Sequence, residues 1–261
     1  MDMKLLNKDD EKIVLLIKDA DATAVNTLRR LIINEVPTLA IEEVNFLKNS
    51  SAMYDEFVAH RIGLITLKTD LKSYTMPDKC KCKGKGEGCA HCQLYFSLKA
   101  QGPGTVYAGD MASKDPKVKP VFPKTPIVKL LKKQVLEFDG IAVLGTGKDH
   151  MKFSPGLVYY QSYPIIKLGN VKNPEQVVAL CPTKVFEVKN NKLAVADQER
   201  CILCNACAEA SSEIKVDGSK KDFIFTVETF GQLSPNEMVS KAFDVFDEKL
   251  DEFTERIGDI K

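Results

Sequence analysis

The chain has 261 residues, and its 37 Lys and Arg against 36 Asp and Glu give a formal net charge of +1. This length suits two or three domains. The balanced charge argues against a chain that grips a nucleic-acid backbone by itself, because such domains usually carry a basic excess. No apolar run approaches the roughly 18 to 20 residues that span a bilayer, and the charged N-terminus is unlike a secretory signal. We therefore expect a cytoplasmic protein without membrane contact.

The N-terminal third predicts a strand, a helix and a second strand. Residues 12–18 form a short apolar run bounded by charge, which is typical of a buried strand, and residues 41–47 have the same character. Between them, apolar residues recur at helical steps up to a proline, and Arg29 and Arg30 lie near the middle of this predicted helix. The apolar stripe and its closing proline are Val25, Leu28, Ile32, Val36 and Pro37.

The amino-acid composition changes in the middle of the chain. From about residue 48 to 156 it is dense in Gly, Pro and Lys, which indicates loops and an inserted module. Residues 157–168 return to strand character, and Pro164 within them suggests a bend or an edge strand.

Residues 169–221 predict a third unit. Asn173 and Pro174 favour a short helix with the asparagine as N-cap. The next segment predicts a hairpin that turns at Asn190-Asn191. Residues 214–216 and the later run FIFTVE predict two strands that pair across a turn at Asp217-Gly218.

The C-terminus predicts a long amphipathic helix. Ser234 and Glu237 form a capping box, with Pro235 at the first helical position. Behind it runs an apolar seam at alternating steps of four and three, which is narrow enough for helix pairing. The apolar seam consists of Val239, Phe243, Phe246, Leu250, Phe253, Ile257 and Ile260. It either lies on this chain's own sheet or packs on a helix of another chain.

Eight cysteines fall into two groups with short gaps, a pattern that indicates metal binding in a cytosolic chain. In the first group two thiolate pairs flank a six-residue loop and could wrap a tetrahedral ion, as in structural zinc sites. We expect zinc at Cys80, Cys82, Cys89 and Cys92, in the loop 80–92. His91 is an alternative ligand, and a metal-free loop is the alternative structure.

The second group resembles half of a ferredoxin. Bacterial-type ferredoxins bind two cubanes with two runs of C-x2-C-x2-C-x3-C-P, and the fourth cysteine of each run serves the other run's cluster. In the run CILCNACAEAS the fourth place is Ser211, and an upstream Cys181-Pro182 is the fourth place of the other run. The remaining places of that other run are Val171, Pro174 and Val177.

All four departures from the ferredoxin pattern remove ligands of the same cluster. We therefore expect one [4Fe–4S] cluster, with a [3Fe–4S] form, zinc or no metal as the alternatives. Its ligands would be Cys181, Cys201, Cys204 and Cys207.

The chain also resembles a known family over nearly its whole length. Residues 26–67, with NTLRR, Val36-Pro37 and the DE-x3-HR-x-GLI stretch at Asp55–Ile65, are similar to the D-subunit family of archaeal RNA polymerases. GKDHMKFSPG at 147–156 is similar to another segment of that family. Eukaryotic third-largest polymerase subunits and the bacterial alpha subunit belong to it as well.

The resemblance implies an α+β fold. An alpha-subunit-like dimerisation domain would be interrupted by an inserted mixed α/β domain and an inserted ferredoxin-like domain. The dimerisation domain would comprise residues 1–47, 157–168 and 222–261. The insert with the zinc loop would cover 48–156, and the iron–sulfur domain 169–221.

The resemblance also implies a function. The chain would pair with the small subunit L, form a platform for the large catalytic subunits, and be joined by small subunits N and P. Arg29, Arg30 and the apolar seam would contact partners, and DNA would be met only through the assembled enzyme. We find no compact acidic group for Mg²⁺ and no phosphate-binding glycine loop, so no active site is expected in this chain. The alternative function is an iron–sulfur electron carrier or oxidoreductase subunit, which rests on residues 169–221 alone.

Overall fold

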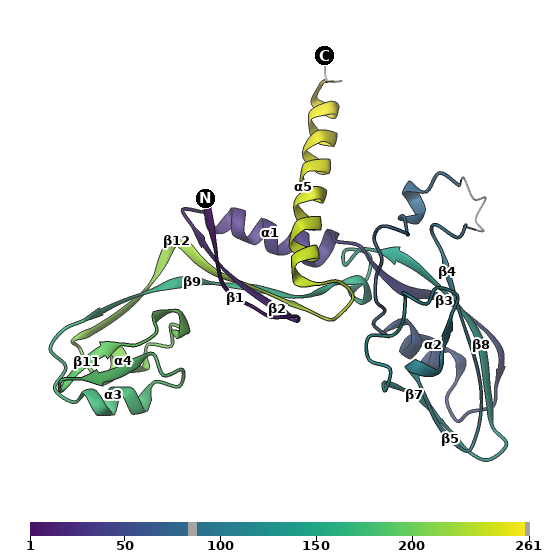
Figure 1. The fold of residues 1–261 in the computed structure, drawn as a ribbon, viewed down its shortest axis with the longest axis horizontal. Helices are drawn as coiled ribbons and strands as arrows, with labels where there is room; N and C mark the ends of the chain where they lie inside the picture. The colour runs from purple at the N-terminus through teal and green to yellow at the C-terminus, as the bar shows by residue number, and fades with distance from the viewer. Residues whose placement is uncertain (83–87, 259–261) are drawn as a thin grey trace. The chain divides into compact units, whose positions relative to one another are not determined.

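The computed structural model describes residues 1–82 and 88–258, and its mixed helices and strands confirm the α+β class. The residue contacts divide the chain into two compact units (Figure 1). The first unit comprises Met1–Arg29 and Val158–Val227, and the second comprises Arg30–Leu157 and Glu228–Lys261. None of the described helices is both long and apolar enough to cross a membrane.

A four-stranded sheet with the order β1-β2-β12-β9 forms the base of the first unit. Its strands are β1 (Asp2–Lys8), β2 (Lys12–Lys18), β12 (Ile214–Thr229) and β9 (Gly156–Leu168). β2 confirms the first predicted strand. β9 confirms the returning strand and is an edge strand, as Pro164 suggested. β1, which the sequence did not predict, is exposed along most of its length at the opposite edge.

Helix α1 (Ala22–Glu35) confirms the predicted helix and its apolar stripe. Val25, Ile32 and Val36 are fully buried, and Leu28 is 5% exposed. Arg29 is half-buried, and its Nε donates to Asn26 Oδ1 at 3.0 Å. Arg30 is exposed. The stripe therefore faces the interior, and the two arginines lie beside it and outward.

The rest of the first unit is a small module of short elements around the second cysteine group. It contains α3 (Pro174–Leu180), β10 (Phe186–Lys189), β11 (Lys192–Val195) and α4 (Ala206–Ala210). The hairpin β10-β11 turns where predicted, with Asn190 and Asn191 both in the left-handed conformation (φ 51° and 59°). Asn173 occupies the predicted N-cap, but its side chain makes no capping hydrogen bond.

The turn predicted at Asp217-Gly218 is wrong. β12 runs through both residues as one strand, and Gly218 has no positive φ. A Cβ on Gly218 would stand 2.8 Å from the Cβ of Ser162 on the neighbouring β9, so the glycine allows two strands to approach closely. The predicted boundary at residue 221 falls inside this strand.

The second unit is built around two sheets with one apolar core. The larger sheet has the order β3-β8-β4-β6, and β5 pairs with β7 in the smaller one. The strands are β3 (Thr38–Asn49), β8 (Val135–Gly145), β4 (Leu94–Gln101), β6 (Ala112–Ser113), β5 (Gly104–Tyr107) and β7 (Pro126–Leu130). β3 includes the strand predicted at 41–47, and it pairs with β8 of the expected insert.

Two helices complete the second unit: α2 (Asp55–Gly63), whose Val58 and Ile62 are fully buried, and the long α5 (Pro235–Gly258). The core contains Phe96, Phe138 and Leu136 from β4 and β8. The first cysteine group and α5 both belong to this second unit.

Candidate metal centres and subunit-contact helix

The first cysteine group is assembled by two short turns. The 3-10 turn Pro77–Lys79 leads into Cys80, and a tight turn closes over Cys89 and Cys92, where Cys92 N donates to Cys89 O at 3.0 Å. The four sulfurs of Cys80, Cys82, Cys89 and Cys92 all lie within 4.8 Å of one another. Residues 83–87 of the connecting loop lie outside the described residues.

The spacing of these sulfurs fits a single tetrahedral ion. A Zn–S bond of about 2.3 Å places neighbouring sulfurs of a tetrahedron about 3.8 Å apart. The Cys80–Cys89 and Cys89–Cys92 Sγ distances are both 3.7 Å, and the Cys82–Cys92 distance is 3.9 Å. The set is complete without His91, which is exposed.

Local hydrogen bonds and burial shift the pKa values of the thiols in this group in opposite directions. The backbone N–H of His91 donates to the sulfur of Cys89 and lowers the pKa of Cys89 to about 7. Burial raises the pKa of Cys92 to about 12. A bound cation would supply the opposite charge that a buried Cys92 thiolate needs, and four soft sulfur ligands suit zinc.

The second cysteine group lies in one small core. Cys201 and Cys207 are each 7% exposed and Cys181 is half-buried, and all three pack with apolar side chains such as Val185 and Ile214. Cys204 is exposed between Leu203 and Asn205, which both have left-handed backbone. That backbone turns the chain sharply around the thiol.

The pKa directions of this group follow from burial and from local donors. Burial raises the pKa of Cys201 and of Cys207. Burial acts in the same sense on Cys181, but hydrogen bonds from the Val185 N–H and the Thr183 hydroxyl outweigh it and lower its pKa. Within the described residues, the sulfurs of the second cysteine group do not all lie within 4.8 Å of one another, as those of the first group do. Thiolates at the corners of a cubane also stand farther apart than those around one ion.

The four residues at the positions of the missing ferredoxin cysteines have other structural roles. Val177 is 2% exposed, and it and Val171 belong to the apolar core of the module. Pro174 begins α3, and Ser211 follows α4, with its N–H donating to Cys207 O at 3.2 Å. Apolar packing and helix ends therefore occupy the positions where a second cluster would need thiolates.

Helix α5 confirms the capping box. The Ser234 hydroxyl and N–H donate to the Glu237 carboxylate at 2.7 and 2.9 Å, and the Glu237 N–H donates back at 3.3 Å. The buried residues of the helix are Pro235, Met238 and Ala242.

The apolar seam lies next to these buried residues, and from Phe243 onward it is solvent-exposed. Val239 is half-buried, but the five large side chains that follow are between 37% and 60% exposed. These five are Phe243, Phe246, Leu250, Phe253 and Ile257. Ile260 lies outside the described residues. The alternative that this seam rests on the chain's own sheet is wrong for the described residues.

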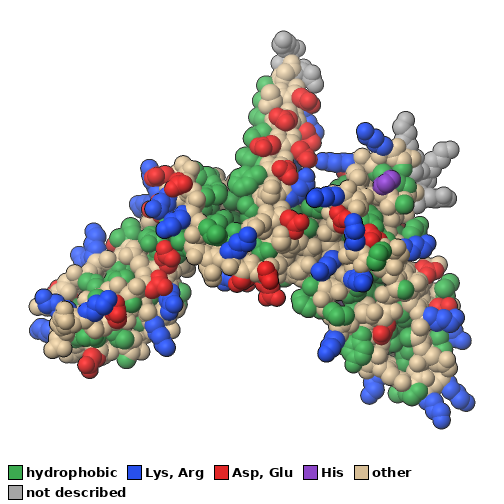
Figure 2. Space-filling model, viewed as in Figure 1, with side chains coloured by type: hydrophobic (Ala, Val, Ile, Leu, Met, Phe, Trp, Pro, Cys, Tyr) green, Lys and Arg blue, Asp and Glu red, His purple; other side chains and the backbone are tan. Residues whose placement is uncertain are grey.

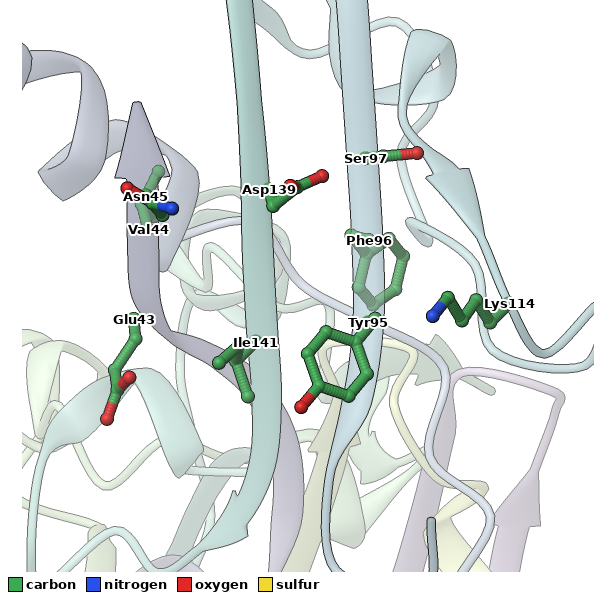
Figure 3. A pocket seen from close by; sticks show the side chains of 9 residues that line it. All are labelled: Glu43, Val44, Asn45, Tyr95, Phe96, Ser97, Lys114, Asp139 and Ile141. Carbon is green, nitrogen blue, oxygen red and sulfur yellow. The ribbon is translucent and has the colours of Figure 1, made fainter. Parts of the chain in front are cut away.

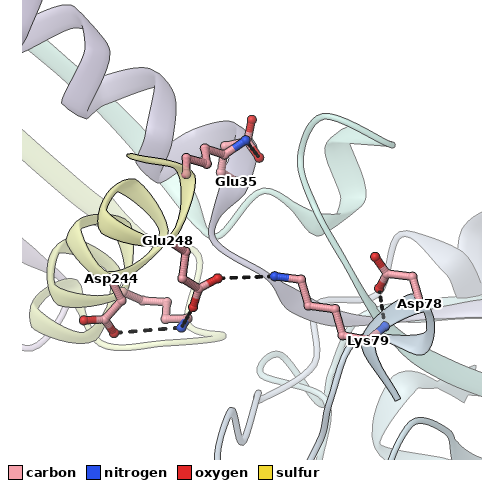
Figure 4. A network of polar contacts seen from close by, with 7 residues as sticks. Glu35, Asp78, Lys79, Asp244 and Glu248 are labelled. Atoms are coloured by element: carbon pink, nitrogen blue, oxygen red, sulfur yellow. Dashed lines mark hydrogen bonds and ion pairs between the residues drawn. The ribbon is translucent and has the colours of Figure 1, made fainter. Parts of the chain in front are cut away.

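Ion pairs connect α5 to the rest of the second unit (Figure 4). Glu248 pairs with Lys79 at 3.2 Å, directly before the first cysteine, and Lys249 pairs with Glu35 at 3.2 Å. Lys241 adds a longer contact to Glu248 at 3.6 Å. The partners in the first two pairs are far apart in the chain, so no local sequence pattern could have predicted them.

A shallow pocket of about 390 Å³ lies on the open face of the β3-β8-β4 sheet (Figure 3). Glu43, Asp139 and Tyr95 come from three neighbouring strands, and Lys114 Nζ stands 4.7 Å from the Tyr95 ring centroid. None of the nine lining residues forms a nucleophile–base pair, so the pocket resembles the solvated face of a sheet more than a reaction site.

Comparison with known proteins places the chain in a family. The family model for the RNA polymerase Rpb3/RpoA insert domain matches residues 40–156. DNA-directed RNA polymerase subunit Rpo3 of Methanosphaera stadtmanae is 39% identical over 96% of both chains. Those of Methanosarcina acetivorans and Archaeoglobus fulgidus are 35% and 34% identical, covering 97% and 100% of this chain and 96% and 99% of theirs. The chain belongs to the archaeal RNA polymerase subunit Rpo3 family. It is therefore one subunit of a nucleotidyltransferase complex.

Two of the motifs that carried the resemblance make contacts within the second unit. In the HR motif, the guanidinium of Arg61 donates to the carbonyls of Ile127 and Pro126 at 2.8 and 2.6 Å and ties α2 to β7. In the GKDHMKFSPG segment, Lys152 Nζ donates to Ile41 O at 3.0 Å and pairs with Glu42. Gly147 lies against the Ile33 carbonyl, where a Cβ would be only 2.1 Å from the oxygen.

Proposed function

We propose that this Rpo3 family member is a non-catalytic assembly subunit that pairs with the small subunit L through the apolar seam of α5. The pair would be the platform for the large catalytic subunits, joined by subunits N and P, and DNA would be met only through the assembled enzyme. The observation that carries this proposal is the exposed apolar seam on a helix whose buried residues are confined to its first turns.

The energetics of the apolar seam support a protein partner. Monomeric proteins rarely leave such a contiguous apolar strip in water. The exposed parts of the five side chains amount to roughly 400 Å², so burying them would contribute about 10 kcal/mol at about 25 cal/mol per Å². That contribution is appropriate for one element of a larger interface.

The arginines of α1 support a second contact. Arg30 is exposed, and Asn26 fixes the orientation of the Arg29 side chain. An oriented guanidinium loses less side-chain freedom when it binds a carboxylate. We propose that this pair contacts a large subunit.

We further propose two metal centres with structural roles. A zinc ion held by Cys80, Cys82, Cys89 and Cys92 would fix the loop beside Lys79, whose side chain contacts α5. An iron–sulfur cluster, [4Fe–4S] or [3Fe–4S], held by Cys181, Cys201, Cys204 and Cys207 would complete the small core of its module or sense the redox state there. Both sites would use thiolates that their surroundings hold in place.

The proposal is tested by affinity capture of the tagged chain from a native extract, followed by the same capture with Phe246→Ala/Leu250→Ala. We expect the wild-type chain to recover a small subunit and both large subunits, and the variant to lose the small subunit. Recovery of a redox enzyme without polymerase subunits would instead favour the electron-carrier function. Undiminished recovery of the small subunit by the variant would exclude the apolar seam as the contact.

A further inference from the structure

Acidic side chains lie on one side of the apolar seam, with Asp247 beside it and Asp251 and Asp244 further round the helix. At about 100° per residue around a helix, Asp247 lies about 80° and Asp251 about 120° from the centre of the seam. Asp244 lies on the same side, and we call these three residues the acidic edge. Figure 2 shows acidic side chains beside apolar ones along α5.

The other side of the apolar seam is turned toward the chain's own core. Met238 and Ala242 are buried there, and further along the same side Lys249 pairs with Glu35 at 3.2 Å. This side is therefore occupied by the second unit itself. A partner that covers the seam can extend only over the acidic edge.

The acidic edge has little compensation within the chain. Asp244 has one long contact, with Lys241 at 3.9 Å. In the ranges 1–82 and 88–258, no ion pair is made by Asp247 or Asp251, and both residues are exposed. Their charges are available to an incoming chain.

We propose that the apolar seam receives a helix of a different chain whose lysine or arginine side chains face Asp247 and Asp251. This inference rests on the proposed assembly function and adds the chemistry of the partner. The apolar contact provides affinity, and the acidic edge selects which helix is accepted and in which orientation.

A second copy of this chain does not satisfy the same geometry. In an antiparallel pair related by a two-fold axis, each edge meets the same edge of its copy, so the acidic edges would repel each other. In a parallel pair, the acidic edge would meet the Lys249 side of the copy. On that side Lys249 already pairs with Glu35, and Met238 and Ala242 are buried against the second unit. The geometry therefore disfavours self-pairing and favours a basic partner.

The test uses the full chain and the small polymerase subunit from the same organism, with the dissociation constant measured at low and high salt. The test variant is Asp247→Lys/Asp251→Lys. The control is Glu255→Lys, which reverses an exposed charge about 160° from the centre of the seam. Each exposed charge pair changes affinity a few-fold, so reversing two of them should weaken binding about 10- to 30-fold at low salt. The loss should shrink at high salt, and the control should change binding less than about 3-fold.

Each outcome has one meaning. Equal effects of test and control variants would overturn the basic-partner inference, while loss of binding in Phe246→Ala/Leu250→Ala would leave the assembly function standing. If that seam variant binds normally, the proposed function through α5 is itself wrong. A stable homodimer of the wild-type chain that the seam variant abolishes would also overturn the inference.

Discussion

Replacing Phe253 by alanine should weaken partner binding without destabilising the free chain. Phe253 is 60% exposed, so its side chain makes few contacts before a partner arrives. A phenylalanine offers about 200 Å² of surface. Burying the exposed part removes roughly 120 Å² from water, which contributes about 3 kcal/mol at about 25 cal/mol per Å².

An alanine at this position recovers about a third of that contribution, so the expected loss is about 2 kcal/mol, or about 30-fold in the dissociation constant. Met238→Ala is the contrasting change, because Met238 is fully buried at the start of the same helix. It should cost about 2–5 kcal/mol in the free energy of unfolding of the free chain. Glu255→Ala, an exposed change on the side away from the seam, should alter neither quantity.

The assays are titration calorimetry with the small subunit and urea denaturation of the free chain. The division of α5 into a buried first part and an exposed second part predicts opposite profiles for Phe253→Ala and Met238→Ala. The reasoning is refuted if Phe253→Ala binds like wild type, or if it destabilises the free chain as much as Met238→Ala does.

Three further predictions concern the metal centres and the helix cap. Anaerobically purified chain should hold about one zinc per chain, and Cys92→Ser should lose the zinc and keep the iron, as measured by elemental analysis. Cys181→Ser should lose iron and the cluster's electron paramagnetic resonance signal while keeping zinc, and Ser211→Ala should lose neither; loss of iron in Ser211→Ala would contradict the assigned ligand set. Ser234→Ala should cost about 1 kcal/mol at neutral pH. Hydrogen bonds from Ser234 lower the pKa of Glu237 below its ordinary 4.5, so this carboxylate stabilises the fold above that value and the contribution is lost as the pH falls through the lowered pKa. The difference in stability between Ser234→Ala and wild type should therefore shrink in acid, with Asn236→Ala as a control that follows wild type at every pH.

Local patterns predicted several elements well because the deciding interactions are short-range. Val25 and Ile32 are buried because their helical spacing gathers the apolar side chains of α1 on one face, and that face packs inward. Asn190 and Asn191 adopt left-handed backbone that few other residues tolerate, and Ser234 and Glu237 bond reciprocally across one helical turn.

Other features depended on neighbours that are distant in the sequence. Gly218 carries the same local signal whether it turns the chain or lets a strand approach Ser162, and only the pairing of β12 with β9 decides between them. β1 has no continuous apolar face, so it becomes a strand only through its register with β2.

For the candidate sites, the sequence by itself determined which side chains are available: eight cysteines in two spaced groups and a helix with an apolar seam. The tertiary structure alone decided their geometry. It brought the sulfurs of Cys80 and Cys89 to 3.7 Å, and it buried Met238 while leaving Phe253 in water. Helical periodicity fixes which residues share a face, but which face meets the core depends on where the second unit places its sheets and ion pairs. That placement is a sum of long-range contacts, which no local stretch of sequence contains.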